Sequence, residues 1–196
     1  GLEAGIDAEA EAVAALLRAH GAYEIRQASD PAERARLWLA RKKAVGAVGR
    51  LAPSKVTMDG VIPRTKLPGV LAAINEVATR HGIRVANVFH AGDGNLHPII
   101  LFDERDEAQT RRVVAAGGEI LDICLAAGGS ITGEHGVGVE KRDHMDRQFG
   151  PNDLAAMQRL RAIFDPDARM NPDKLFPSRR GCGEVGVAPG RGGMMC

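Results

Sequence analysis

The stretch that decides the fold is Val88-Phe89-His90-Ala91-Gly92-Asp93-Gly94-Asn95-Leu96-His97-Pro98, which has apolar, β-favouring segments on both sides. Asp93-Gly94 at its centre is typical of a two-residue type I′ hairpin turn, in which both central residues need a positive φ. This turn places His90 directly opposite His97 on one face of a sheet, with Cβ atoms roughly 4.5–5.5 Å apart. Two imidazoles at that separation can bind one metal ion.

Pro98 agrees with this register. If Gly92 and Asn95 close the turn as a hydrogen-bonded pair, hydrogen-bonded and non-hydrogen-bonded pairs alternate outward from them. Phe89 and Pro98 then form a non-hydrogen-bonded pair. Proline has no N–H to donate, so it is tolerated there.

The composition excludes several classes of protein. The 196 residues carry a formal net charge of +1 and 4% aromatic residues, which argues against a nucleic-acid-binding surface. No apolar run approaches the ~20 residues of a transmembrane segment, and no signal peptide begins the sequence. Cys124, Cys182 and Cys196 lack metal-ligand spacing and indicate reduced thiols. We therefore expect a cytoplasmic protein, with peripheral attachment at the inner face of the membrane left open.

Helical and extended segments alternate along the chain. Composition, periodicity and caps such as Asp30-Pro31 and Asn152 predict helices at 7–19, 31–48, 67–81, 108–127, 139–147 and 153–164. Extended segments are expected at 23–27, 55–62, 83–89 and 96–102. Residues 178–196 turn to Gly, Arg, Pro and Met and are expected to form a disordered tail after one domain at 1–177. The predicted fold class is α+β, an antiparallel sheet covered by helices, with a C-terminal helical segment.

A glycine-rich loop from Ser130 to Gly138 carries Glu134 and His135 side by side. The flanking glycines let the backbone aim both side chains at one place. Two histidines with one carboxylate form an open coordination set, used by catalytic zinc and by non-haem iron. His135 then suits a catalytic base, because histidine titrates near neutral pH. The residues alone leave two interpretations, a metal site or a structural cluster.

Three motifs together carry a family resemblance: residues 90–98 (His-Ala-Gly-Asp-Gly-Asn-Leu-His-Pro), 128–138 (Gly-Gly-Ser-Ile-Thr-Gly-Glu-His-Gly-Val-Gly) and 171–177 (Asn-Pro-Asp-Lys-Leu-Phe-Pro). In this order they resemble the C-terminal half of the FAD-linked, vanillyl-alcohol-oxidase-like flavoenzymes, over roughly residues 38–177. Arg50-Leu51-Ala52-Pro53 and Met58-Asp59-Gly60 are most similar to the glycolate oxidase and D-lactate dehydrogenase members of that group. The resemblance implies a ferredoxin-like cap.

The resemblance also implies roles for individual residues. His90, His97 and Glu134 match divalent-metal ligands, for zinc, manganese or iron, and His135 matches the catalytic base. Further matches are Asn95 in the substrate pocket, Arg41 on the substrate carboxylate, and Asn171 and Lys174 near the flavin. Two positions depart from the family pattern: Asp173 replaces the usual glycine, and Lys55 is near but out of register with a lysine that some relatives use.

FAD is implied, but no segment resembles the family's N-terminal FAD domain. Gly92-x-Gly94-x-x-His97 lies in a hairpin and does not open a helix, so it is no dinucleotide fingerprint. We expect the FAD domain on a missing N-terminal segment or on another chain, and an iron–sulfur or other electron-acceptor subunit as a further partner.

The predicted function is therefore the substrate- and metal-binding part of a flavin-dependent 2-hydroxy-acid dehydrogenase. It would transfer hydride from the α-carbon of a small 2-hydroxy acid to FAD, and it would be inactive without the FAD domain. The alternatives are a stand-alone metal-binding module, a metal-dependent hydrolase, or an inactive truncated fragment.

Overall fold

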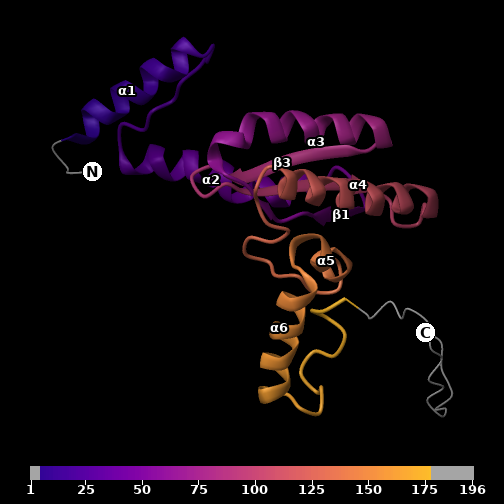
Figure 1. Cartoon of the computed structure of the whole chain (residues 1–196). Helices are drawn as coiled ribbons and strands as arrows, with labels where there is room; N and C mark the ends of the chain where they lie inside the picture. The colour runs from indigo at the N-terminus through magenta and orange to yellow at the C-terminus, as the bar shows by residue number, and fades with distance from the viewer. Residues whose placement is uncertain (1–4, 178–196) are drawn as a thin grey trace. The chain divides into compact units, whose positions relative to one another are not determined.

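The computed structural model describes residues 5–177, and the predicted disordered tail lies outside these residues. The chain divides into two compact units, Gly1–Val48 and Gly49–Cys196. Figure 1 shows the elements in chain order. The first unit holds α1 (Ile6–Ala19) and α2 (Pro31–Val48). The second holds β1 (Ser54–Thr57), β2 (Gly60–Val61), η2 (Arg64–Lys66), α3 (Leu67–His81), β3 (Arg84–His90), β4 (Asn95–Phe102), α4 (Glu107–Ala126), η3 (Arg142–His144), α5 (Met145–Gln148) and α6 (Pro151–Phe164).

In the first unit the predicted cap is confirmed and the predicted strand is wrong. The Asp30 carboxylate accepts a hydrogen bond from the Glu33 N–H at 2.7 Å, and α2 begins at Pro31. Residues 23–27 form no strand. Tyr23 is 99% exposed, so this segment does not bury the apolar side chains that would hold a strand in a sheet.

The second unit is built on an antiparallel sheet with β4 at its centre. β3 pairs with one edge of β4, and β1 and β2 pair with successive parts of the other edge. β1 and β2 keep the same register on β4, which places Asp59, between them, beside His97. An isolated bridge from Val61 to Ser130 extends this edge. The predicted α+β class with an antiparallel sheet is confirmed.

The predicted register of the hairpin is wrong by two residues. His90 pairs with Asn95 and Val88 pairs with His97, because the connection is four residues long, Ala91 to Gly94. Gly94 has a φ of 73°, but Asp93 has no positive φ, so a type I′ turn does not form. A shift of two residues keeps every side chain on its predicted face. His90 and His97 are therefore diagonal neighbours on one face instead of a directly opposed pair.

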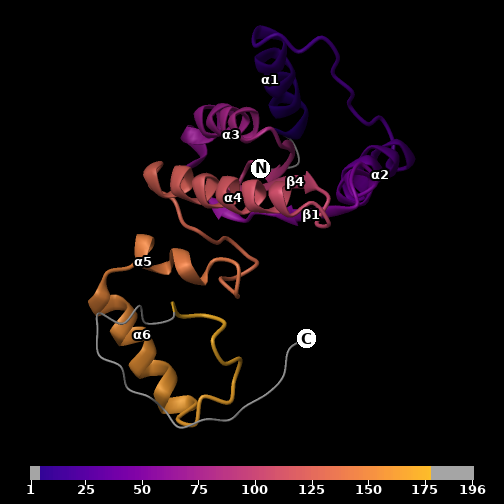
Figure 2. The ribbon, with the colours of Figure 1, turned by 90° about the vertical axis from the view of Figure 1, so that its right-hand side faces the viewer.

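Helices α3 and α4 pack against each other and cover one face of the sheet (Figure 2). Side chains alternate along β4, and Leu96 and Ile100 point into the core between sheet and helices. Asn95 and His97 therefore lie on the opposite face. The core is completed by buried apolar residues of the two helices: Val70, Ile74, Val77, Ala78, Val113, Ala116, Ile120 and Leu121.

The C-terminal helical segment differs in detail from the prediction. The single helix expected at 139–147 is instead η3 followed by the short α5. Helix α6 begins at Pro151, and the Asp153 carboxylate accepts the Gly150 N–H at 3.0 Å, so Asn152 is not the cap. No helix among residues 5–177 has the length and apolar character needed to cross a bilayer.

Candidate functional site

The hairpin and the glycine-rich loop bring His90, His97 and Glu134 together. One ligand atom from each residue lies within 4.8 Å of those of the other two. Glu134 Oε1 is 3.0 Å from His97 Nε2 and 3.9 Å from His90 Nε2. The His97 ring is buried, whereas His90 and Glu134 are partly open to solvent. The three residues thus form one cluster at the surface, with its innermost member on the central strand.

His135 lies beside the same cluster. Its ring stacks on His97 with centroids 5.0 Å apart and planes 8° from parallel. Its Nε2 is 3.8 Å from Glu134 Oε1. Gly136, with a φ of 82°, follows directly and allows the loop to turn away after His135. The flanking glycines expected to aim Glu134 and His135 at one place therefore lie in a loop that does so.

Asn95 forms the buried wall of the site. Its side chain is nearly inaccessible, and Asn95 Oδ1 has no hydrogen-bond partner within residues 5–177. Gly133 packs so closely that a Cβ there would lie 2.6 Å from this oxygen. The amide is thus held at the base of the cluster with an acceptor unsatisfied, as expected for a group that meets a ligand.

Asp59 is a site residue that the sequence interpretation missed. It is fully buried, and its carboxylate accepts hydrogen bonds from Thr132 Oγ1 at 2.7 Å and from the N–H groups of the following three loop residues. The Lys141 ammonium, also buried, lies 3.2 Å from Oδ2. Burial raises the pKa of Asp59, but the hydrogen bonds from the loop outweigh it and hold the pKa well below the ordinary value. Asp59 is therefore ionised at neutral pH.

A signal for Asp59 was present in the sequence. It is the single charged residue in the segment from Val56 to Ile62, which is otherwise apolar or small. A lone carboxylate in a buried strand needs hydrogen-bond donors or a cation close by. The sequence motif does not tell where those donors come from, because they lie 73 to 76 residues further along the chain.

Two donor sets in the described part of the chain satisfy the distances of a metal site. The second set is Asp59, His97 and His135. Asp59 already accepts several hydrogen bonds and lies against the Lys141 cation, which would repel a metal ion. The set of His90, His97 and Glu134 has no such cation in contact and two partly exposed members. Its residue types are those of an open zinc or iron site, so the residues fit a divalent metal.

The other predicted site residues lie elsewhere. Arg41 is on α2 in the first unit, half-buried. Asn171 and Lys174 lie in the exposed segment after α6, where Arg161 donates to the Asn171 carbonyl and Arg142 donates to that of Asp173. Asn171 and Asp173 both have positive φ values. The roles of Arg41, Asn171 and Lys174 stay predictions.

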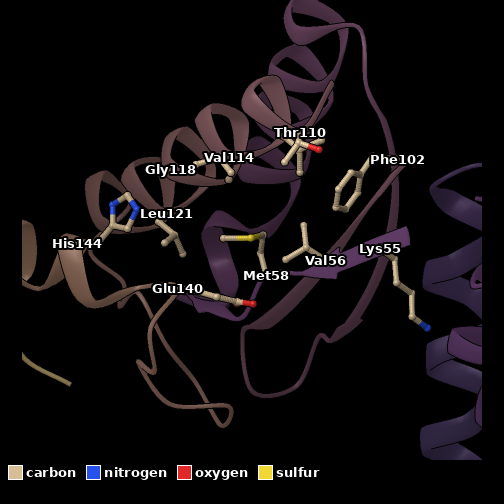
Figure 3. A pocket seen from close by; sticks show the side chains of 12 residues that line it. Lys55, Val56, Met58, Phe102, Thr110, Val114, Gly118, Leu121, Glu140 and His144 are labelled. Atoms are coloured by element: carbon tan, nitrogen blue, oxygen red, sulfur yellow. The ribbon is translucent and has the colours of Figure 1, made fainter. Parts of the chain in front are cut away.

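Two hollows lie near these elements. A pocket of about 320 Å³ has His135 on its wall, together with Thr57 and residues 136–141. A second pocket, of about 410 Å³, lies between β1 and α4 (Figure 3). Its lining is mainly apolar, with the Met58 side chain in its middle and Glu140 and His144 at one end. Among the predicted site residues, only His135 lines either hollow, so the first is the one next to the cluster.

Comparison with known proteins decides the family. Residues 2–175 match the family described as FAD linked oxidases, C-terminal domain. The chain belongs to this family. It is similar to glycolate oxidase subunit GlcD of Escherichia coli strain K12, with 46% identity over 187 residues, 95% of this chain and 38% of that protein. GlcD of Bacillus subtilis strain 168 is 34% identical over 171 residues, 87% of this chain and 36% of that protein.

A mitochondrial D-lactate dehydrogenase [cytochrome] of Arabidopsis thaliana is 30% identical over 179 residues, 90% of this chain and 32% of that protein. The predicted family is thus confirmed. This member of the FAD-linked oxidase family spans less than two fifths of the length of the relatives named here.

Proposed function

We propose that the chain is the substrate- and metal-binding part of a flavin-dependent 2-hydroxy-acid dehydrogenase. The observation that carries this proposal is the convergence of His90, His97 and Glu134 from two distant segments, with His135 stacked beside them. Membership of the FAD-linked oxidase family and similarity to proteins named glycolate oxidase subunit GlcD and D-lactate dehydrogenase support the reaction class.

His90, His97 and Glu134 would hold a divalent ion. Such an ion would supply Lewis acidity at the substrate hydroxyl oxygen. The three residues fix where that oxygen lies, and the buried ring of His97 anchors the set to the central strand. Zinc, manganese and iron all accept this donor set.

His135 is the proposed base. Its ring lies beside Glu134 and borders the adjacent pocket, so a hydroxyl bound at the cluster is within its reach. It removes the hydroxyl proton while the α-carbon gives up a hydride. Asn95 lines the site from below, and Arg41 is proposed to bind the substrate carboxylate through its planar guanidinium group.

The hydride acceptor lies outside the residues described here. The Gly92 to His97 segment is a hairpin loop and makes no phosphate cradle at a helix start. Flavin, supplied by an FAD domain elsewhere in the enzyme, would accept the hydride. Asn171 and Lys174 are proposed to lie near that flavin, and an electron-acceptor subunit is a proposed further partner.

Single substitutions test the assignment of ligands and base. Replacing His90, His97 or Glu134 by Ala should remove most bound metal from the 196-residue chain, because two remaining ligands bind a divalent ion weakly. His135→Ala should keep the metal and lower turnover in the flavin-containing assembly by about 10²–10⁴-fold. Metal content is measured by elemental analysis and turnover by dye reduction with glycolate or D-lactate.

His81→Ala is the matched control. His81 Nε2 lies 2.7 Å from Glu119 Oε1, so it is another histidine–carboxylate contact in the same unit, but without a third ligand. Its removal should change neither metal content nor turnover. Loss of metal from His135→Ala with retention in His97→Ala would reverse the proposed roles. A colourless assembly that hydrolyses esters would favour a metal-dependent hydrolase instead.

A further inference from the structure

Asp59 joins the two segments that form the candidate metal site. It lies in the short gap between β1 and β2, beside His97 on the neighbouring strand. It is fully buried, so its charge is compensated entirely by groups of the protein. This position gives one carboxylate access to both the histidine hairpin and the glycine-rich loop.

The loop wraps around this carboxylate. Asp59 Oδ2 accepts Thr132 Oγ1 at 2.7 Å, the Gly133 N–H at 2.9 Å and the His135 N–H at 2.9 Å. The Glu134 N–H lies 3.2 Å from Oδ1. Successive N–H groups therefore converge on one side chain. With the backbone of Glu134 and His135 fixed in this way, both side chains start from a defined point.

Asp59 also faces the ring of His97. His97 Nε2 is turned to Glu134, 3.0 Å away, whereas His97 Nδ1 is 3.9 Å from Asp59 Oδ1. Nδ1 is buried and has no hydrogen-bond partner among the described residues. A histidine that binds a metal through one nitrogen commonly donates its other N–H to a carboxylate, which fixes the orientation of the ring. Asp59 is the carboxylate placed to receive it.

We propose that Asp59 is the positioning residue of the metal site, holding the Glu134–His135 backbone and orienting His97 through Nδ1. This inference rests on the proposed function. Lys141 is its charge partner: the ammonium lies 3.1 Å from the Asp59 carbonyl oxygen and 3.2 Å from Oδ2, on a side chain that is 3% exposed. Lys141 neutralises the pair and makes no contact with His97 that the structure records.

The test compares Asp59→Asn, the double variant Asp59→Asn/Lys141→Met, and Lys141→Met, each in the full 196-residue chain. The double variant removes the carboxylate without leaving a buried cation unpaired, which guards against simple unfolding. Zinc affinity is measured by competition with a chelator, after circular dichroism has established that each variant is folded. The double variant should bind zinc about 10–100-fold more weakly, and Lys141→Met should stay close to wild type. Wild-type affinity in the double variant would overturn the proposal.

Two further measurements separate positioning from general stability. In the zinc-loaded wild-type chain, NMR should show a slowly exchanging His97 Nδ1 proton, and this signal should be lost in the double variant. Its absence from the wild-type chain would overturn the proposal without reference to any variant. Amide exchange at Gly133, Glu134 and His135 should accelerate in the double variant, and unchanged protection would also count against Asp59.

The outcomes distinguish the two proposals. If His97→Ala loses zinc and the double variant does not, the metal site stands and the role of Asp59 fails. If His90→Ala, His97→Ala and Glu134→Ala all keep zinc, the proposed function fails. The amide exchange of the loop then still decides whether Asp59 holds it.

Discussion

Asp165 is a single carboxylate that holds the chain together just after α6. It accepts the Arg169 N–H at 2.7 Å and the Met170 N–H at 2.9 Å, and Arg161 lies 3.4 Å away. Burial raises the pKa of Asp165, but these hydrogen bonds and the arginine outweigh it, so the pKa lies below the ordinary value. The ionised form is therefore the one that the fold stabilises.

This pKa direction predicts how stability depends on pH. With the folded pKa below the unfolded value of about 3.9, Asp165 contributes its full stabilisation above that value. The contribution is lost as pH falls through the lower folded pKa. The free energy of unfolding in urea should therefore fall less between about pH 5 and pH 3 in Asp165→Asn than in wild type. Asp167→Asn, an exposed neighbour paired with Arg169 at 3.7 Å, is the control and should follow wild type. An identical fall in all three chains would contradict the prediction.

At the scale of residues, the sequence predicts the cluster better than its surroundings. His90, His97, Glu134 and His135 are expected as one group, and the structure places them together. The sequence marks Asp59 only as part of a family motif. A side chain that acts through hydrogen bonds to a distant backbone leaves no local pattern, so periodicity and spacing do not reveal it. Arg41 lies in the other unit, so its proposed role stays a prediction.

At the scale of elements, helices are predicted more accurately than the hairpin turn. The ranges 31–48 and 67–81 match α2 and α3 to the residue, because proline, glycine and charged caps mark both ends. The predicted hairpin register is wrong because Asp93-Gly94 is only part of the turn. Pro98 does not expose the error, since a shift of two residues preserves which pairs are hydrogen-bonded.

Gly94 tests the loop that the structure contains. Its φ is 73°, and a Cβ there would lie 2.0 Å from the Ile62 carbonyl oxygen, whose own N–H is bonded to the Gly94 carbonyl. Gly94→Ala should cost about 1–3 kcal/mol from the backbone conformation alone, with a further cost from moving Ile62. Gly92→Ala is the matched control, two residues away with open space around it, and should change stability little. Equal urea midpoints for the two variants would refute this account of the loop.

Gly117 predicts the opposite sign of effect. It lies inside α4, and a Cβ there would be 3.3 Å from Met58 Sδ, the flexible side chain in the middle of the 410 Å³ pocket (Figure 3). Met58 has room to move, so Gly117→Ala should raise the free energy of unfolding by about 0.5–1 kcal/mol through helix propensity. In Gly118→Ala the new methyl group would meet the His144 ring at 3.2 Å, and the gain should be smaller. A lower melting temperature for Gly117→Ala than for wild type would show that the pocket does not yield.

At the scale of the whole molecule, the sequence predicts fold class and family correctly but not the division into two units. The alternation of helices and strands is enough for α+β, because each element carries its own periodicity. The division at Val48 follows contacts that are distributed over many residues, which no motif marks.

The isolated chain should bind a divalent metal and yet oxidise neither glycolate nor D-lactate. Its described residues provide ligands and a base, but they offer no phosphate cradle for a dinucleotide. Dye reduction and flavin absorbance should both appear only when the chain is assembled with an FAD domain, for example the one of a GlcD relative. Turnover by the metal-loaded chain without flavin would contradict the proposed reaction.

The placement of Asp59 has a consequence for the order of folding. The two histidine strands are joined by four residues, whereas Asp59 meets the glycine-rich loop 73 to 76 residues further along the chain. Contacts that are close in sequence form sooner than those that must close a long loop. The nascent chain therefore presents a pair of histidines well before their carboxylate partner arrives. Metal capture is in this sense a late event, and a loaded site reports that the slowest long-range contacts have already been made.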